Sequence, residues 1–149
     1  MIRGCVPKKL LVYGAQARHQ LADASAYGLE IGSLRSDVPD LLRRVRAEVD
    51  RLNALHLGFL EKAGVQLISG WGRFMAADRI GISNQRGGPV REELSAPRFL
   101  VAVGGRPVRP NFPGVEKTWV SDDMFLLEDV PPSVVVVGAG FIACEFACI

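Results

Sequence analysis

The sequence predicts an α/β fold in which a parallel sheet with helices is combined with a small β-meander. Two long stretches place apolar residues at helical spacing, and short strand-like runs separated by turn residues follow them. Near the C-terminus, four consecutive valines lead into a glycine-containing turn. A chain of 149 residues is long enough to bury one hydrophobic core.

The first helix is expected over residues 7–27. Its apolar and small residues recur every three or four positions, as on one face of a helix, and Gly28 is a suitable C-terminal stop. The residues of this face are Leu10, Leu11, Gly14, Ala17, Leu21 and Ala24. A longer amphipathic helix is expected to follow Asp37 and to end at Gly64.

Three strands are expected after the second helix, at residues 65–69, 79–83 and 99–103. The turn-forming residues 84–89 fit the loop of a meander. The last of the three runs enters Gly104-Gly105, where the absence of side chains lets another group approach the backbone closely.

A cysteine, a proline and two lysines open the first apolar run, in the order Cys5-Val-Pro-Lys-Lys. Pro7 suits the first turn of a helix, because an N–H group at that position would have no hydrogen-bond acceptor within the helix. The unpaired N–H groups and the dipole at a helix start stabilise a thiolate, and we therefore expect Cys5 to be a reactive thiol. A small buried side chain is the alternative interpretation, because it is the usual state of a single cysteine.

The valine run at 134–137 leads through Gly138-Ala139-Gly140 into a helical pattern that includes Ala143, which gives Gly-x-Gly-x-x-Ala. In such a turn the first glycine permits a tight bend, and the second lets a pyrophosphate approach the backbone. The small third residue lets the helix pack closely on the strand. We expect a dinucleotide to bind here, in a cradle formed by Gly138, Ala139, Gly140 and Ile142. A plain strand–helix turn is the alternative.

Composition and charge argue against several classes of function. The net charge of +2 is too small to indicate a nucleic-acid or membrane partner, and no apolar run approaches the roughly 20 residues of a membrane span. The absence of a secretory signal or a disulfide framework makes the cytoplasm the expected compartment. Cys144 and Cys148 are expected to be small core residues, so no metal site is predicted. Four arginines are expected on the solvent-exposed face of the second helix: Arg43, Arg44, Arg46 and Arg51.

The segment of residues 1–16 resembles the active-site segment of the flavin-dependent pyridine nucleotide–disulfide reductases, above all the glutathione reductase branch. The motif of that family is Cys-x-x-x-x-Cys-Val-Pro-Lys-Lys. Cys5 matches the second cysteine, which faces the flavin, and the first, which attacks the disulfide, is expected immediately before Met1. The resemblance implies that Lys8 lies beside the flavin ring and pairs with Glu145 on the helix of the NADPH-binding domain.

Three further positions match the family. Gly72, in Gly-Trp-Gly, resembles the segment whose backbone meets the adenine of FAD. Gly104 lies in a segment similar to Ala-Thr-Gly-Gly-Arg-Pro, in which Val103 replaces the usual threonine. Phe141 stands where a tyrosine commonly covers the flavin, so the stacking ring is kept and the hydroxyl is lost. The resemblance implies FAD and NADPH as cofactors and oxidised glutathione as the small-molecule disulfide substrate.

The resemblance also implies two partial Rossmann-type domains. Residues 1–105 would belong to the FAD-binding domain, and residues 106–149 would open the NAD(P)-binding domain with 134–137 as its first parallel strand. We expect the chain to be an internal piece of a homodimeric reductase and to be inactive alone. Trypanothione reductase and the large thioredoxin reductases share Pro-Lys-Lys and are alternatives. A non-catalytic nucleotide-binding or protein-interaction remnant is an alternative of a different class.

Overall fold

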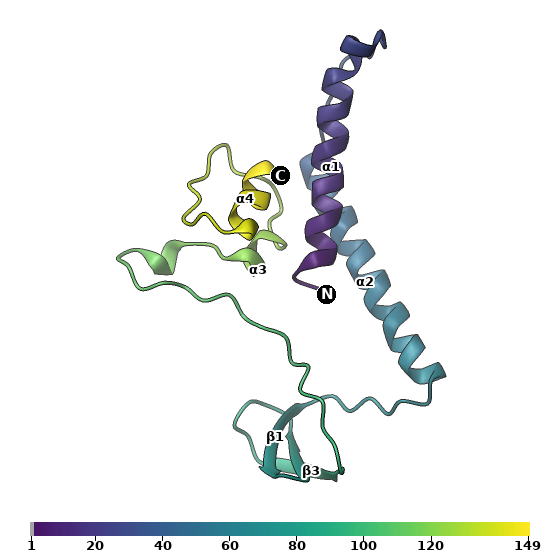
Figure 1. Cartoon of the computed structure of the whole chain (residues 1–149), viewed down its shortest axis with the longest axis vertical. Coiled ribbons are helices and arrows are strands. Elements are labelled where there is room, and N and C mark those ends of the chain that lie inside the picture. Colours follow the sequence, from purple (N-terminus) through teal and green to yellow (C-terminus); the bar gives the residue numbers. More distant parts are fainter. Residues whose placement is uncertain (1) are drawn as a thin grey trace. The chain divides into compact units, whose positions relative to one another are not determined.

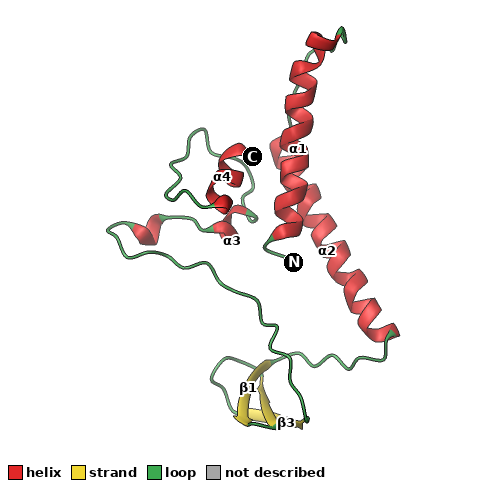
Figure 2. Cartoon of the chain, in the orientation of Figure 1, coloured by secondary structure: helices red, strands yellow, loops and turns green. Residues whose placement is uncertain are grey.

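The computed structural model describes residues 2–149, and the chain divides into two compact units (Figure 1 and Figure 2). The first unit runs to His56 and resumes over Pro107–Ile149, and the second is Leu57–Arg106. This division reflects packing, whereas the predicted boundary between residues 105 and 106 separates cofactor-binding domains and stays a prediction.

Helix α1 spans Cys5–Asp23 and continues as a 3₁₀ turn, η1, over Ala24–Tyr27. Gly28 follows with a φ of 75°, a left-handed conformation that glycine adopts without strain, and its N–H donates to the carbonyl of Ser25 at 3.1 Å. The predicted helix and its stop are confirmed. The helix begins two residues earlier than expected, because Pro7 occupies its third position, where no N–H is needed.

Helix α2 spans Val38–Lys62 and has the predicted signals at both ends. Oδ1 of Asp37 accepts a hydrogen bond from the N–H of Asp40 at 2.9 Å, which satisfies one of the unpaired donors of the first turn. Hydrogen bonding from Arg44 holds the pKa of Asp40 below its usual range. Gly64 ends the helix with a φ of 70°.

The core of the first unit lies between α1, α2 and the residue that follows α3 (Ser121–Met124). A 3₁₀ turn, η2, covers Val115–Lys117 before α3. Four side chains that are at most 7% exposed make up this core: Leu11, Leu42, Val45 and Phe125. Helix α4 (Phe141–Cys148) packs on the core through Phe146.

The second unit contains an antiparallel meander of β1 (Trp71–Ala76), β2 (Arg79–Ser83) and β3 (Val90–Ser95). The strand at 79–83 and the turn that follows it are confirmed. The strands expected at 65–69 and 99–103 are wrong, since neither segment pairs with another in the described chain. Most of their apolar side chains are exposed, among them Leu67 and Val103, although the ring of Phe99 meets that of Phe74 edge-on at 5.2 Å.

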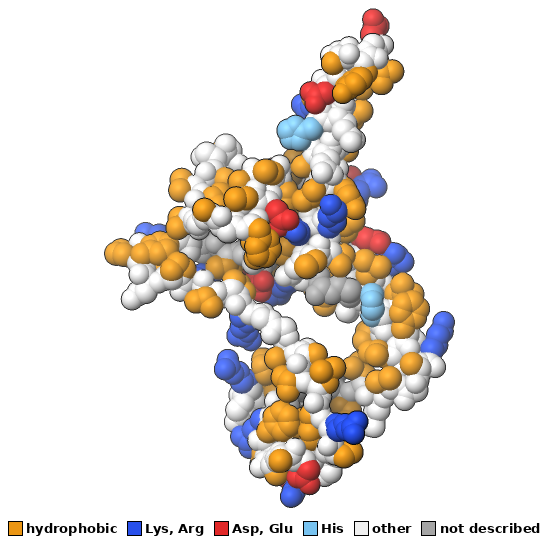
Figure 3. All heavy atoms as spheres, viewed as in Figure 1, with side chains coloured by type: hydrophobic (Ala, Val, Ile, Leu, Met, Phe, Trp, Pro, Cys, Tyr) orange, Lys and Arg blue, Asp and Glu red, His pale blue; other side chains and the backbone are white. Residues whose placement is uncertain are grey.

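The predicted parallel sheet is also wrong. Within residues 2–149 the structure contains only the antiparallel meander, and residues 134–137 form no strand. A strand requires hydrogen bonds to a neighbouring strand, and no described segment pairs with the valine run, in which Val135 is 91% exposed. Many other apolar side chains are exposed at the surface (Figure 3). The helix predicted after the glycine turn does form, as α4.

Gly70 is expected to be essential for the meander, whereas Gly72 should tolerate a methyl group. A Cβ at Gly70 would lie 2.6 Å from Cγ2 of Ile82 and 2.9 Å from the carbonyl oxygen of Ser83, which is backbone held in the β1–β2 ladder. A Cβ at Gly72 would make an ordinary contact of 3.4 Å with Ile80. We expect G70A to destabilise the meander by about 1–3 kcal/mol, as overpacking does. Amide hydrogen exchange of β2 measures this, and equal protection in G70A and G72A would contradict it.

Candidate functional site

Cys5 is the first residue of α1, and its thiol is free and exposed. The N–H of Lys8 donates to the carbonyl of Gly4 at 3.2 Å and closes the first turn. Pro7 in this turn is less than 2% exposed, so the turn is fixed against the core. Because the first N–H groups of a helix have no acceptor within it, their positive ends gather around Cys5. This is the setting in which protein thiols act as nucleophiles.

Lys8 and Glu145 form an ion pair that joins α1 to α4 across 137 residues of sequence. Nζ lies 2.6 Å from Oε1 and 2.7 Å from Oε2, so the ammonium bonds both carboxylate oxygens. The side chains are 22% and 37% exposed, and partial burial strengthens the attraction relative to a pair in open water. Since Cys5 is three positions before Lys8, the two residues lie on the same face of α1. The structure thus brings together the two charges that the resemblance paired.

The turn formed by Gly138, Ala139 and Gly140 leads directly into α4. Gly138 has a φ of 122°, which favours glycine, and the carbonyl of Gly140 accepts the N–H of Cys144 at 3.1 Å. A Cβ built on either glycine would meet no atom within 4 Å, so the space over the turn is open. The first N–H groups of α4 have no acceptor within the helix. Open backbone beside free N–H groups fits the pyrophosphate of a dinucleotide.

The other predicted binding residues lie beside this turn or in the second unit. Phe141 and Ile142 open α4 and are 75% and 46% exposed, so both are accessible to a ligand. In the second unit, Gly104 has a φ of 69° with no atom near the position of its missing Cβ. Gly72 lies in β1 opposite Ile82. The backbone of Gly104 is therefore open to close approach, whereas Gly72 is part of the meander.

Cys144 and Cys148 are both exposed, so the expectation of buried core cysteines is wrong. The apolar contact of α4 is made by Phe146, which leaves both thiols outside the core. Within residues 2–149, no three His, Cys, Asp or Glu side chains gather closely enough to hold a metal ion. In the same part of the chain, no helix combines the length and the apolar character needed to cross a membrane.

Sequence reasoning missed Phe125 and misplaced Arg46. Phe125 is 7% exposed, and Nη1 of Arg46 donates to the carbonyl of Leu127 at 2.7 Å in a partly buried contact. Arg46 was expected on the solvent-exposed face of α2. Its position argues against that exposure, because it is four residues after the buried Leu42 and therefore on the apolar side of the helix.

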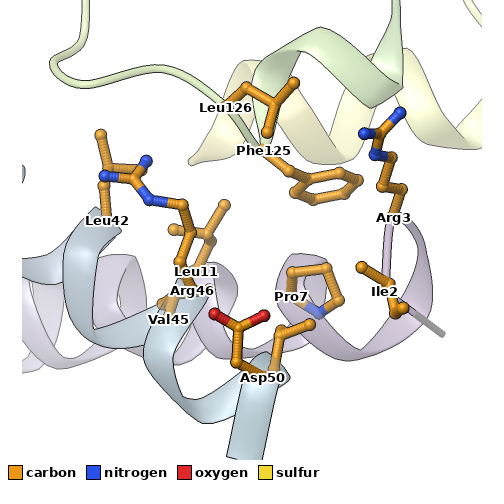
Figure 4. A pocket seen from close by; sticks show the side chains of 11 residues that line it. Ile2, Arg3, Pro7, Leu11, Leu42, Val45, Arg46, Asp50, Phe125 and Leu126 are labelled. Carbon is orange, nitrogen blue, oxygen red and sulfur yellow. The ribbon is translucent and has the colours of Figure 1, made fainter. Parts of the chain in front are cut away.

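A pocket of about 150 Å³ lies in the first unit between the start of α1, the helix α2 and the residues that follow α3 (Figure 4). Its walls include the apolar side chains Pro7, Leu11, Leu42, Val45, Val49 and Phe125. Arg3, Arg46 and Asp50 are among its polar neighbours. No cysteine lines the pocket, and neither partner of the Lys8–Glu145 pair does. The pocket therefore shares walls with the core and includes none of the side chains proposed above for the site.

The sequence profile of the pyridine nucleotide-disulphide oxidoreductases matches residues 1–149, which is the whole chain. The chain belongs to this family. Pyridine nucleotide-disulphide oxidoreductases of this type are Rossmann-type FAD/NAD-binding proteins, and the glutathione reductases among them use FAD and NADPH.

Three curated relatives of this chain are each called glutathione reductase. The relative from Nostoc sp. (strain PCC 7120) is 38% identical over 147 residues, and the chloroplastic/mitochondrial one from Pisum sativum is 37% identical over 148. The one from Burkholderia cepacia is 34% identical over 147 residues. Each alignment covers 99% of this chain but only 30%, 26% and 31% of the respective relative. The chain thus spans about three tenths of the length of the curated relatives it matches.

Proposed function

We propose that this chain is part of an NADPH-dependent flavoprotein that reduces oxidised glutathione. The observation that carries the proposal is the Lys8–Glu145 ion pair. It ties the helix that starts at Cys5 to the helix that starts at the dinucleotide-type turn, so a thiol, an ammonium and a nucleotide turn belong to one unit. The relatives support glutathione as the substrate class, since all three carry that name.

Cys5, Lys8 and Glu145 are the proposed catalytic residues. When bound, FAD would supply two electrons to a disulfide formed between Cys5 and a second cysteine, and the two thiols released would reduce the substrate by thiol–disulfide exchange. The positive charge of Lys8 would favour the electron-rich reduced form of a flavin bound beside it. Glu145 holds the ammonium in place through its two oxygens, a charge-assisted arrangement.

Named residues of the chain would hold the two cofactors, NADPH as the hydride donor and FAD as its acceptor. For NADPH these are Gly138, Ala139, Gly140 and Ile142, whose open turn and free N–H groups suit a pyrophosphate. Phe141 is the proposed aromatic cover of the flavin. The remaining proposed FAD contacts are Lys8, Glu145, Gly72 and Gly104. In this proposal residues 1–105 belong to the FAD-binding domain and 106–149 to the NAD(P)-binding domain of a cytoplasmic homodimer.

A chimaera tests the proposed function directly. Residues 1–149 would replace the matching segment of the Nostoc relative, which supplies the parts of a reductase outside the aligned region. We expect the purified chimaera to bind FAD and to oxidise NADPH when oxidised glutathione is added. A folded, FAD-loaded chimaera that reduces no glutathione disulfide would contradict the proposal.

The isolated 149-residue chain is expected to show no turnover. Reduction of a disulfide by thiol exchange uses one thiol to attack and a second to resolve the mixed disulfide. Cys5 is the only cysteine before Cys144, so its segment offers one thiol where two are needed. Incubation of the chain with FAD, NADPH and oxidised glutathione measures this, and NADPH oxidation above the buffer rate would contradict it.

A further inference from the structure

Among the described residues, two contacts of different chemistry stand out between α4 and the rest of the first unit. One is the Lys8–Glu145 ion pair. The other is between the rings of Phe125 and Phe146, whose centroids are 5.5 Å apart at an interplanar angle of 55°. Glu145 and Phe146 are consecutive residues, so the apolar contact lies directly beside the ionic one.

Phe125 is fixed on its own side of this contact. Its ring is 7% exposed and belongs to the core made with α1 and α2. Downstream, the guanidinium of Arg46 holds the carbonyl of Leu127 at 2.7 Å. Upstream, Oδ2 of Asp123 accepts the N–H of Val120 at 2.9 Å, which fixes the turn that carries the ring. The ring therefore has a defined position relative to α2.

The contact of Phe146 with Phe125 fixes α4 on the core and thereby fixes the position of the neighbouring Glu145. The residues Ile142, Glu145 and Phe146 of α4, and Ile149 directly after it, recur at intervals of three, one and three positions, as on one face of a helix. A partly exposed ion pair contributes little stability and does not by itself fix the end of a short helix. A packed aromatic contact has a preferred geometry and excludes water, and it is the stronger of the two constraints on α4.

We propose that Phe125 and Phe146 are positioning residues for the Lys8–Glu145 pair. The contact between their rings sets where α4 lies on the core and thereby keeps the Glu145 carboxylate on the Lys8 ammonium. The consequence for flavin chemistry rests on the proposed function, but the positioning itself is a property of this chain and needs no cofactor to be measured.

The reactivity of Lys8 toward an acylating reagent reports on the ion pair. A paired ammonium is protected, and Lys9 provides an internal reference because it is exposed and lies on a different face of the same helix, 4.7 Å from the ring centre of Tyr13. The full 149-residue chain would be acetylated with a limiting amount of an N-hydroxysuccinimide ester, and the Lys8-to-Lys9 ratio would be read by peptide mass spectrometry. E145Q, which removes the carboxylate charge, sets the upper value of the ratio.

We expect F146A to raise the Lys8-to-Lys9 ratio about threefold, close to the E145Q value, as for loss of a partly exposed ion pair. F125M removes the other ring while keeping apolar volume in the core, and it should raise the ratio similarly. I149A is the matched control, since it shortens an apolar side chain directly after α4 and keeps both rings, and it should leave the ratio unchanged.

Two results would overturn the proposal. The first is a Lys8-to-Lys9 ratio in F146A and F125M equal to that of the wild type, while the ratio in E145Q is raised. This result would contradict the positioning role but not the ion pair or the proposed function. The second is an equal rise in I149A, which would mean that any loosening of α4 releases Lys8. If E145Q itself shows no rise, the ion pair does not form in solution, and both this proposal and the observation behind the proposed function are overturned.

Discussion

Replacing Cys5 by serine is expected to lower the NADPH-driven reduction of oxidised glutathione by the chimaera by at least about a thousandfold. A serine hydroxyl does not ionise at neutral pH and cannot exchange with a disulfide. Removing the nucleophile of a serine protease costs about 10⁶-fold in kcat, so a thousandfold is a cautious expectation. The rate of NADPH oxidation with oxidised glutathione measures the loss.

Two controls separate this effect from damage to the fold. C148S removes another exposed thiol of the chain and should leave turnover within about twofold, because surface substitutions away from a site usually have small effects. In C5S, NADPH should still bleach the absorbance of the bound flavin, since that step precedes thiol exchange. Turnover in C5S equal to that in C148S would refute the role assigned to Cys5.

The two glycines of the proposed nucleotide turn, Gly138 and Gly140, are expected to respond differently to replacement by alanine. Gly138 has a φ of 122°, so a Cβ there costs about 1–3 kcal/mol and loosens the turn even without nucleotide. Gly140 has a φ of −72° and no atom within 4 Å of its missing Cβ, so G140A should fold normally. If a pyrophosphate lies against this backbone, the new methyl group takes its place. We expect G140A to weaken NADPH binding by about tenfold or more, a loss of about 1.4 kcal/mol.

Thermal melting and NADPH titration of the chimaera distinguish these outcomes. G138A should lower both the Tm and the affinity, whereas G140A should lower the affinity alone. Gly105 is a matched control, since a Cβ there meets no atom within 4 Å and the residue is not assigned to the NADPH site. NADPH binding by G140A as tight as by G105A would remove the turn from the nucleotide site.

The helices could be predicted because their signals are local. The stops at Gly28 and Gly64 and the cap at Asp37 act within a few residues, and all three are found where the sequence places them. Strands depend on partners far along the chain, so apolar composition alone placed only one of three correctly, at 79–83. The valine run at 134–137 has strand composition but pairs with no described segment.

In the candidate site, too, the features set by local sequence could be predicted and those that depend on distant contacts could not. Cys5 at a helix start and the turn at 138–140 follow from local chemistry, whereas spacing alone could not pair Lys8 with Glu145, and only the family resemblance did so. Phe125 was missed because nothing in its sequence neighbourhood marks one phenylalanine as the contact between a core and a distant helix.

The separation of Lys8 and Glu145 also bears on the order in which the chain folds. Closing a loop of 137 residues costs roughly 4 kcal/mol of chain entropy, several times what a partly exposed ion pair returns. The ion pair alone therefore cannot offset the entropy lost when the loop between Lys8 and Glu145 closes. We expect the helices and the meander, whose contacts are local, to form early, and the ion pair to form after Phe125 has entered the core. The charges of the site should then be among the last features to come together during folding and among the first to separate when the core loosens.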